Sequence, residues 1–199
     1  MSLADVSNLR SSITSWLLGR TDLAPQVDDF IALNEADINM VLRVREMEAS
    51  SDLTPVDGVA TLPADYLAWR TVTALTSPRR DLDFVAPSAM PDACGTIPRT
   101  FTITGDSLVL DATGTFDVRL AYYARIPALS DANTTNWLLE KAPNVYLFGC
   151  LKYAAVFISD EAAASMYGTL FVSTMEALMV ADKGARWARG GVRLEGPTP

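Results

Sequence analysis

The chain of 199 residues contains no histidine. Histidine is the side chain that titrates nearest neutral pH, and it is a common ligand for transition metals. Its absence removes the usual general base, the Ser–His and Cys–His nucleophile pairs, and metal sites built on imidazole. Glycine loops that bind phosphate, of the types G-x-x-x-x-G-K-[ST] and G-x-G-x-x-G, are also missing. We therefore expect no catalytic, cofactor-binding or metal-binding residues.

Cysteine and long apolar runs are scarce. The cysteines, Cys94 and Cys150, number only two, which argues against a disulfide framework and fits a reducing compartment. The N-terminus lacks the basic lead and apolar run of a secretory signal. The most apolar segment, residues 145–158, is interrupted by Lys152 and is shorter than the roughly 20 residues that a membrane span needs. We expect a buried helix there and no membrane contact.

Basic charge is also sparse, and it is concentrated in the tail. The formal net charge is -8. Residues 183–199 have a net charge of +3, because they contain four basic residues and one acidic residue: Lys183, Arg186, Arg189, Arg193 and Glu195. The preceding residues have a net charge of -11. Sequence-independent nucleic-acid binding depends on neutralising phosphates with Lys and Arg. An acidic body therefore argues against that function.

Helical periodicity marks both ends of the chain. Apolar residues recur at helical spacing over residues 3–18 and 26–46. Towards the C-terminus, Asn136 is placed to cap a helix over 137–141, Pro143 to begin one that runs to 158, and Asp160 to cap a last helix from 161 to about 183. We predict a helix for each of these segments.

The middle of the chain has a β pattern. The dipeptides Asp57-Gly58 and Gly105-Asp106 predict two hairpins, with strands at 52–56 and 59–62 and at 101–104 and 107–110. Further strands are predicted at 71–76 and 116–123. Four prolines in residues 77–98 indicate irregular connections or short edge strands.

These elements predict an α+β fold. Residues 1–50 and 126–182 are expected to form an antiparallel helical bundle, and residues 51–125 a small antiparallel β module inserted into it. Residues 183–199 contain too little apolar surface for a core of their own and are expected to form a flexible C-terminal arm. The same tail has two interpretations: a disordered terminus, or an arm whose Trp187 and arginines anchor a partner.

Paired carboxylates are the one catalytic arrangement left, because glycoside hydrolysis needs only two. The candidate pairs are Glu35 with Asp37, Glu46 with Glu48, and Asp160 with Glu161. We interpret each pair as structural. They would form a solvated face of the second helix, the frayed end of that helix, and the start of the last helix, where negative charge suits the helix dipole.

Four segments stand out by their sequence and their order: residues 29–39 with 42–47, residues 62–67, residues 122–130 and residues 136–149. Together they resemble the head-to-tail adaptor proteins of tailed bacteriophages, as found in short-tailed phages. The resemblance covers about residues 10–180, and the tail is the least similar part.

The resemblance implies a structural virion protein that is not an enzyme. Such adaptors form a homo-oligomeric, dodecameric ring on the portal, extend the DNA channel without binding the genome specifically, and present a docking surface to a tail or nozzle protein. This places the protein at the head-tail junction of the virion, after synthesis in the host bacterial cytoplasm. The adaptor's C-terminal segment reaches the portal, so the resemblance assigns portal contact to Arg186, Trp187, Arg189, Val192, Arg193 and Leu194.

Two alternative functions remain open at this stage. A virion-associated cell-wall hydrolase would use two of the carboxylates, and replacing Glu35 or Glu46 by the amide would then abolish peptidoglycan cleavage. A tail-completion or stopper ring protein would share the ring geometry. Gene deletion separates this alternative, because loss of an adaptor leaves heads without tails, whereas loss of a late tail part leaves the connector in place.

Overall fold

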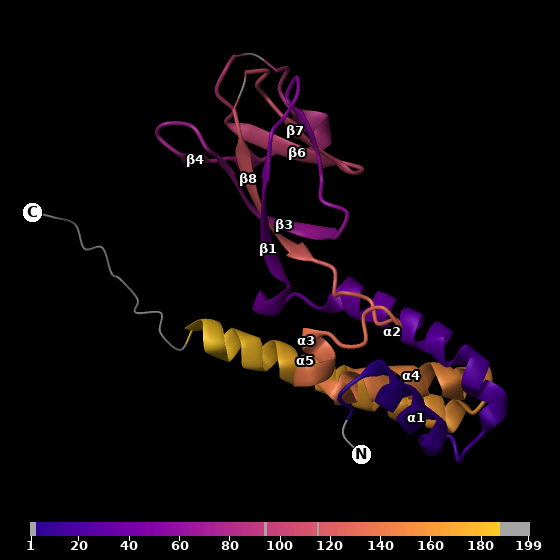
Figure 1. Cartoon of the computed structure of the whole chain (residues 1–199). Coiled ribbons are helices and arrows are strands. Elements are labelled where there is room, and N and C mark those ends of the chain that lie inside the picture. The colour runs from indigo at the N-terminus through magenta and orange to yellow at the C-terminus, as the bar shows by residue number, and fades with distance from the viewer. Residues whose placement is uncertain (1–2, 94, 115, 188–199) are drawn as a thin grey trace, which may run out of the picture. The chain divides into compact units, whose positions relative to one another are not determined.

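The computed structural model describes residues 3–93, 95–114 and 116–187. Contacts divide the chain into two compact units: unit 1 comprises Met1–Arg45 with Ile126–Pro199, and unit 2 comprises Glu46–Arg125. Figure 1 shows that the long helices belong to unit 1 and the strands to unit 2. The fold is therefore α+β, as the sequence predicted.

Unit 1 is built from helices of both ends of the chain. With η marking a 3-10 helix, its elements are α1 (Val6–Trp16), η1 (Thr21–Gln26), α2 (Val27–Val41), α3 (Trp137–Lys141), α4 (Pro143–Phe157) and α5 (Glu161–Trp187). Helix α4 packs against α1, α2 and α5. Its side chains are buried on several sides, including Tyr146, Cys150 and Leu151, as expected for a helix that is apolar all round.

Side chains cap the starts of three helices. Asp5 Oδ1 accepts the Asn8 N–H at 2.7 Å before α1. Asn136 Oδ1 accepts the Leu139 N–H at 2.9 Å before α3. Asp160 Oδ1 accepts the Ala163 N–H at 3.0 Å before α5. Each side chain satisfies one of the N–H groups that a helix start leaves without an intrahelical acceptor. The predicted caps at Asn136 and Asp160 are confirmed, whereas α1 spans Val6–Trp16 rather than residues 3–18 and has Asp5 as its cap.

The C-terminal ends of α2 and α5 also differ from the prediction. Helix α2 ends at Val41 rather than near residue 46, because Leu42 turns extended and both Leu42 and Val44 are buried in the core. Helix α5 runs on to Trp187 rather than ending near Lys183. The added residues are mostly good helix formers, and the single Gly184 costs only about 1 kcal/mol relative to alanine.

Unit 2 holds two sheets among its described residues. One has the order β1-β8-β3-β4 and the other β2-β7-β6-β5. The strands are β1 (Glu48–Leu53), β2 (Val59–Thr61), β3 (Tyr66–Ala74), β4 (Arg80–Asp81), β5 (Asp83–Phe84), β6 (Thr100–Thr104), β7 (Ser107–Leu110) and β8 (Val118–Ala124); η2 (Arg45–Met47) and η3 (Pro87–Ala89) are 3-10 helices.

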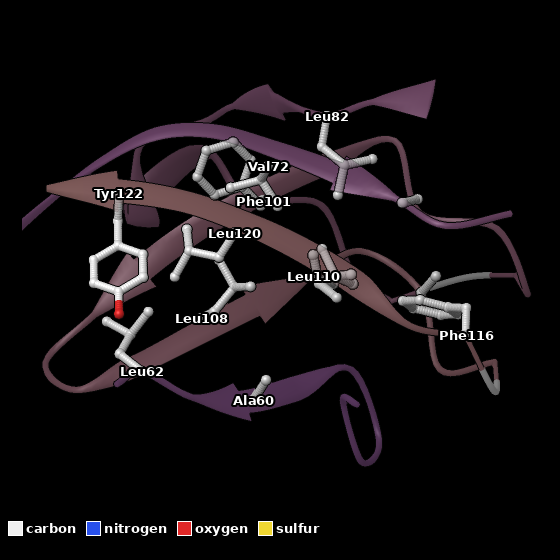
Figure 2. Close-up of a cluster of buried hydrophobic side chains, with 13 residues drawn as sticks. Ala60, Leu62, Val72, Leu82, Phe101, Leu108, Leu110, Phe116, Leu120 and Tyr122 are labelled. Atoms are coloured by element: carbon white, nitrogen blue, oxygen red, sulfur yellow. The ribbon is translucent and has the colours of Figure 1, made fainter. Parts of the chain in front are cut away.

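A hydrophobic core separates the two sheets of unit 2. Figure 2 shows Leu108 of β7, Leu120 and Tyr122 of β8, and Leu62, which follows β2, in this core. Phe101 is fully buried in the same cluster. Alternate residues of β7 and β8 face this core, which is the period-two pattern of half-buried strands.

The first predicted hairpin is wrong in its partners. Asp57 and Gly58 form the expected turn, both with positive φ (51° and 78°), and Val56 pairs with Val59 across it. The flanking strands then part: β1 pairs with β8 and β2 pairs with β7, in different sheets. Pro55 has no N–H with which to extend a ladder beyond the turn. The second predicted hairpin, β6 with β7 around Gly105, is confirmed.

The side chain of Asn34 on α2 lies close against Gly149 of α4. A Cβ added at Gly149 would lie 1.8 Å from Asn34 Oδ1, so the Asn34 side chain would have to move. We expect Gly149→Ala to lower the free energy of unfolding by about 2 kcal/mol through overpacking, which outweighs the gain in helix propensity. Urea denaturation followed by far-ultraviolet circular dichroism measures the change.

The matched control is Gly184→Ala in α5, where an added Cβ meets nothing within 4 Å. This variant should be neutral or more stable by up to about 1 kcal/mol. Equal effects of the two substitutions would contradict the close packing of α2 on α4.

Candidate docking surfaces

The predicted partner residues lie at the end of α5 or beyond it. Arg186 and Trp187 are its last two residues. The other four, Arg189, Val192, Arg193 and Leu194, lie outside the described residues. Just before this end, the buried carboxylate of Asp182 accepts the Arg45 N–H at 3.3 Å and lies 3.6 Å from Arg45 Nε. This contact fixes within unit 1 the point from which the tail continues.

A buried polar network joins α2 to the chain that returns from unit 2. Glu35 Oε1 accepts the Leu129 N–H at 2.9 Å and the Tyr146 hydroxyl at 3.0 Å. Asn136 Nδ2 donates to the Tyr146 hydroxyl at 2.7 Å and to the Pro127 carbonyl at 2.8 Å. Residues 127–136 are thereby held to both α2 and α4.

A second part of α2 continues this attachment. Asn39 Oδ1 accepts the Ile126 N–H at 3.0 Å. Asp37 Oδ2 accepts from Lys152 Nζ at 2.5 Å and from the Tyr153 hydroxyl at 2.7 Å, both on α4. The prediction that Glu35 and Asp37 form a solvated face is wrong, because Glu35 is only 7% exposed and Asp37 is partly buried against α4.

Burial shifts the titration of this network. It raises the pKa of Glu35, although the Leu129 N–H and the Tyr146 hydroxyl act in the opposite direction. Burial and the neighbouring Glu35 raise the pKa of Tyr146 and of the Cys150 thiol as well. Asp37 differs: burial alone would raise its pKa, but the hydrogen bonds from Lys152 and Tyr153 outweigh it and lower the pKa.

The candidate carboxylate pairs each have structural partners. Glu35 Oε1 is engaged by two donors inside the core. Glu48 lies on β1, where it pairs with Arg70 of β3, rather than at a frayed helix end. Asp160 caps α5 as predicted. One member of each candidate pair therefore has a structural contact.

The aromatic residues of the sequence divide between the two units. Tyr122 packs in the core of unit 2, where its hydroxyl donates to Asp65 at 2.9 Å. In unit 1, Trp16 of α1 lies 6.2 Å from Phe148 and 6.5 Å from Tyr167, measured between ring centroids. These rings pack helices and strands, and they do not form a common stacking platform.

An apolar groove lies in unit 1 between α2, α4 and α5. Its volume is about 690 Å³, and its apolar lining includes Met40 and Val41 of α2 with Phe171 and Val172 of α5. Lys152 reaches into it from α4, paired with Asp37 and 4.9 Å from the Phe171 ring. Met40, Val41 and Val172 are 76%, 58% and 53% exposed, so this surface is open to a partner.

Helix α5 is unusually apolar for its exposure. Its stretch Glu161–Ala185 is long and apolar enough to cross a membrane by length and composition alone, with mean hydropathy 1.2, and 17% of its most apolar 18-residue window is buried. The buried side is a single stripe, Phe171, Met175, Leu178 and Asp182, at the spacing of one helix face. The remaining apolar surface of α5 has no cover within the described residues.

Unit 2 has its own exposed features. A pocket of about 700 Å³ is lined in part by Arg80, Arg99, Asp92 and Asp111. On the β3 side, Trp69 stacks on Phe84 with ring centroids 5.3 Å apart, and both rings are partly exposed. The pocket therefore carries side-chain charges of both signs.

Comparison with known families identifies the chain. A family model described as SU10 adaptor protein matches residues 4–194. The chain belongs to this family. SU10 adaptors are phage head-to-tail adaptors, so this adaptor is a structural component of the virion at the head-tail junction, and its family implies a role that is not enzymatic. No curated protein matches the chain.

The match bears out the resemblance seen in the sequence, and the structure explains part of it. Asn34, Glu35 and Asn39 of the buried network come from the first resembling segment, residues 29–39. Their partners come from the third and fourth, residues 122–130 and 136–149. Sequence reasoning missed the groove of this SU10 adaptor. No local sequence signal marked the groove, because its lining comes from α2, α4 and α5, which are far apart in the sequence.

The network predicts the pH dependence of the adaptor's stability. The pKa of Glu35 is raised above its ordinary value of 4.5. The contribution of Glu35 to the free energy of unfolding is therefore complete below its ordinary pKa, and it is lost as the pH rises through the pKa of the folded state. A glutamine in its place cannot ionise and keeps an acceptor oxygen for the Leu129 N–H. We expect Glu35→Gln to gain stability relative to wild type between about pH 4 and pH 7, measured by urea denaturation.

Asp37→Asn serves as the contrasting variant. Because the pKa of Asp37 is lowered, its contribution is present at neutral pH and lost on acidification. This variant should therefore be less stable than wild type at neutral pH and approach it towards pH 3. If the difference in free energy of unfolding between Glu35→Gln and wild type did not change between about pH 4 and pH 7, the assigned environment of Glu35 would be contradicted.

Proposed function

We propose that this adaptor forms a homo-oligomeric, dodecameric ring that docks on the portal, extends the DNA channel and offers the tail or nozzle protein its attachment surface. The family match over residues 4–194 carries this proposal, because it spans the described helices and strands of both units and part of the tail. A ring of identical subunits needs two different surfaces per subunit that meet head to tail. The exposed flanks of α5 are consistent with that need.

The C-terminal residues are proposed as the portal contact. In this proposal unit 1 acts as an antiparallel helical bundle and residues 183–199 as an arm whose first residues continue α5. Beyond Trp187, twelve residues remain, and fully extended they span about 40 Å. Arg186, Trp187 and Arg189 are of the residue types that dominate interface energies, and the arm also carries Val192, Arg193 and Leu194.

The charge of the chain supports passage of DNA without attachment. Residues 1–182 carry a net charge of -11. A ring of such subunits would have a mainly negative channel, and attraction to phosphate would be weak. The protein would be made in the host bacterial cytoplasm and would assemble on the portal, where contacts offset the entropy of ordering the arm.

Portal docking is tested by native mass spectrometry of the adaptor mixed with the portal ring of the same phage. We expect a discrete complex with one adaptor per portal subunit. A chain that ends at Trp187 should lose this complex, because it keeps α5 but lacks the arm. A chain with residues 188–199 in scrambled order is the control for composition, and it should also bind poorly. An unchanged portal mass with the full chain would end the portal proposal.

The channel proposal predicts weak DNA binding by the assembled ring. At physiological salt, the dissociation constant for a duplex of arbitrary sequence should exceed about 10⁻⁴ M, the weak end of non-specific binding. Fluorescence anisotropy with a labelled duplex measures it. Micromolar binding, or an assembled channel lined mostly by Lys and Arg, would show that the channel is not repulsive.

A further inference from the structure

Helix α5 has an exposed flank that is distinct from the groove. Five residues at spacings of four, four, seven and four form one stripe, and all five are exposed: Ala162, Met166, Leu170, Ala177 and Ala181. Met166 and Leu170 are 52% and 38% exposed. This stripe, here called the ridge, combines two large apolar side chains with three alanines, which let another helix approach closely.

The ridge carries no charge. At 100° per residue, the charged residues of α5 fall within a sector of about 120°, and the ridge lies outside it. They are Glu161, Glu176, Asp182, Lys183 and Arg186. The groove lies on the charged side, where Val172 and Glu176 line it. One helix therefore presents a concave surface on one flank and an uncharged ridge on the other.

We propose that the groove of one copy receives the α5 ridge of a neighbouring copy of this chain. The inference rests on the proposed ring, and it names the lateral contact of that ring. Groove and ridge are different surfaces of the same unit, so each copy can offer its ridge to one neighbour and its groove to the other. This is the head-to-tail arrangement that closes into a ring when the rotation between copies fits.

The charges of the groove favour this occupant. Burying a charge is costly unless it is paired. Lys152 and Asp37 already pair with each other in the groove, and Lys152 also lies over the Phe171 ring. An uncharged ridge can cover this pair without adding a charge of its own, and the carboxylate of Glu176, which also lines the groove, is exposed. Elsewhere on α2 and α4, Leu33 and Phe157 are also exposed.

A lipid surface fits the same features less well. A membrane span by α5 would have to remove Phe171 and Met175 from the core of unit 1 and separate Asp182 from Arg45. It would also carry Glu176 into the apolar layer, which is costly. A neighbouring copy covers the ridge and the groove while leaving these contacts in place.

Photo-crosslinking tests the proposal on the full chain. The amino acid p-benzoyl-L-phenylalanine replaces Met40 at the groove in one preparation and Val56 of unit 2, which is similarly exposed, in the control. Each protein is mixed as nitrogen-14 and nitrogen-15 forms, irradiated alone and with the portal ring, and mapped by mass spectrometry. We expect adducts from position 40 to residues 162–181 of the other isotopic form, and no such adducts from position 56.

A ridge substitution sharpens the result. Leu170→Glu should reduce the yield of the adduct from position 40 at least tenfold by placing a charge in the contact, whereas Val56→Glu should leave it unchanged. Circular dichroism establishes that both variants keep their helices. Adducts that are unaffected by Leu170→Glu would overturn the ridge as the occupant.

The outcomes separate this inference from portal docking. A portal complex without adducts between copies, or with adducts from position 40 to the portal only, would overturn the inference and leave docking standing. Adducts between copies without any portal complex would support the inference and remove docking. Phosphatidylglycerol vesicles are added in a further sample, and adducts to lipid in place of the second copy would overturn the inference.

Discussion

The hydrogen bonds that Glu35 accepts in the core of unit 1 are the constraint on which the helical unit depends. Unit 1 is made from two segments of chain that are separated by the whole of unit 2. The returning segment has no regular structure near Leu129, so its N–H groups need side-chain acceptors. Glu35 supplies one and Asn39 another. Because buried polar groups must be paired, this network allows one position for the returning chain.

In unit 1 the polar network is buried, whereas apolar side chains of α5 are exposed. Glu35, Asn136 and Tyr146 have the burial and shifted pKa values that often mark active sites, but in this adaptor they hold segments together. The groove and ridge of α5 are its least covered apolar surfaces, and such surfaces mark interaction sites. A protein that joins two assemblies needs this distribution, with a fixed interior and unfilled contacts on its outer helices.

Local signals predicted much of the fold, whereas long-range pairing was missed. The caps at Asn136 and Asp160 were predictable because each depends on a hydrogen bond within three residues. The partners of β1 and β2 were not, since a turn fixes its own geometry but not the sheets beyond it. Irregular pairing in β3 near Trp69 disturbs the alternation of buried and exposed residues along the strand. The first half of that strand was therefore not predicted. The burial of Glu35 depends on residues about a hundred positions away, so no local pattern could reveal it.

Hydrogen exchange at the amides of Ile126 and Leu129 tests the central claim most directly. Both amides lie outside helices and strands, and both donate to side chains of α2. If α2 holds the returning chain, they exchange as slowly as the amides of α4, through unfolding of unit 1 as a whole. If they exchange at the rate of an exposed loop while α4 stays protected, the network does not hold unit 1 together.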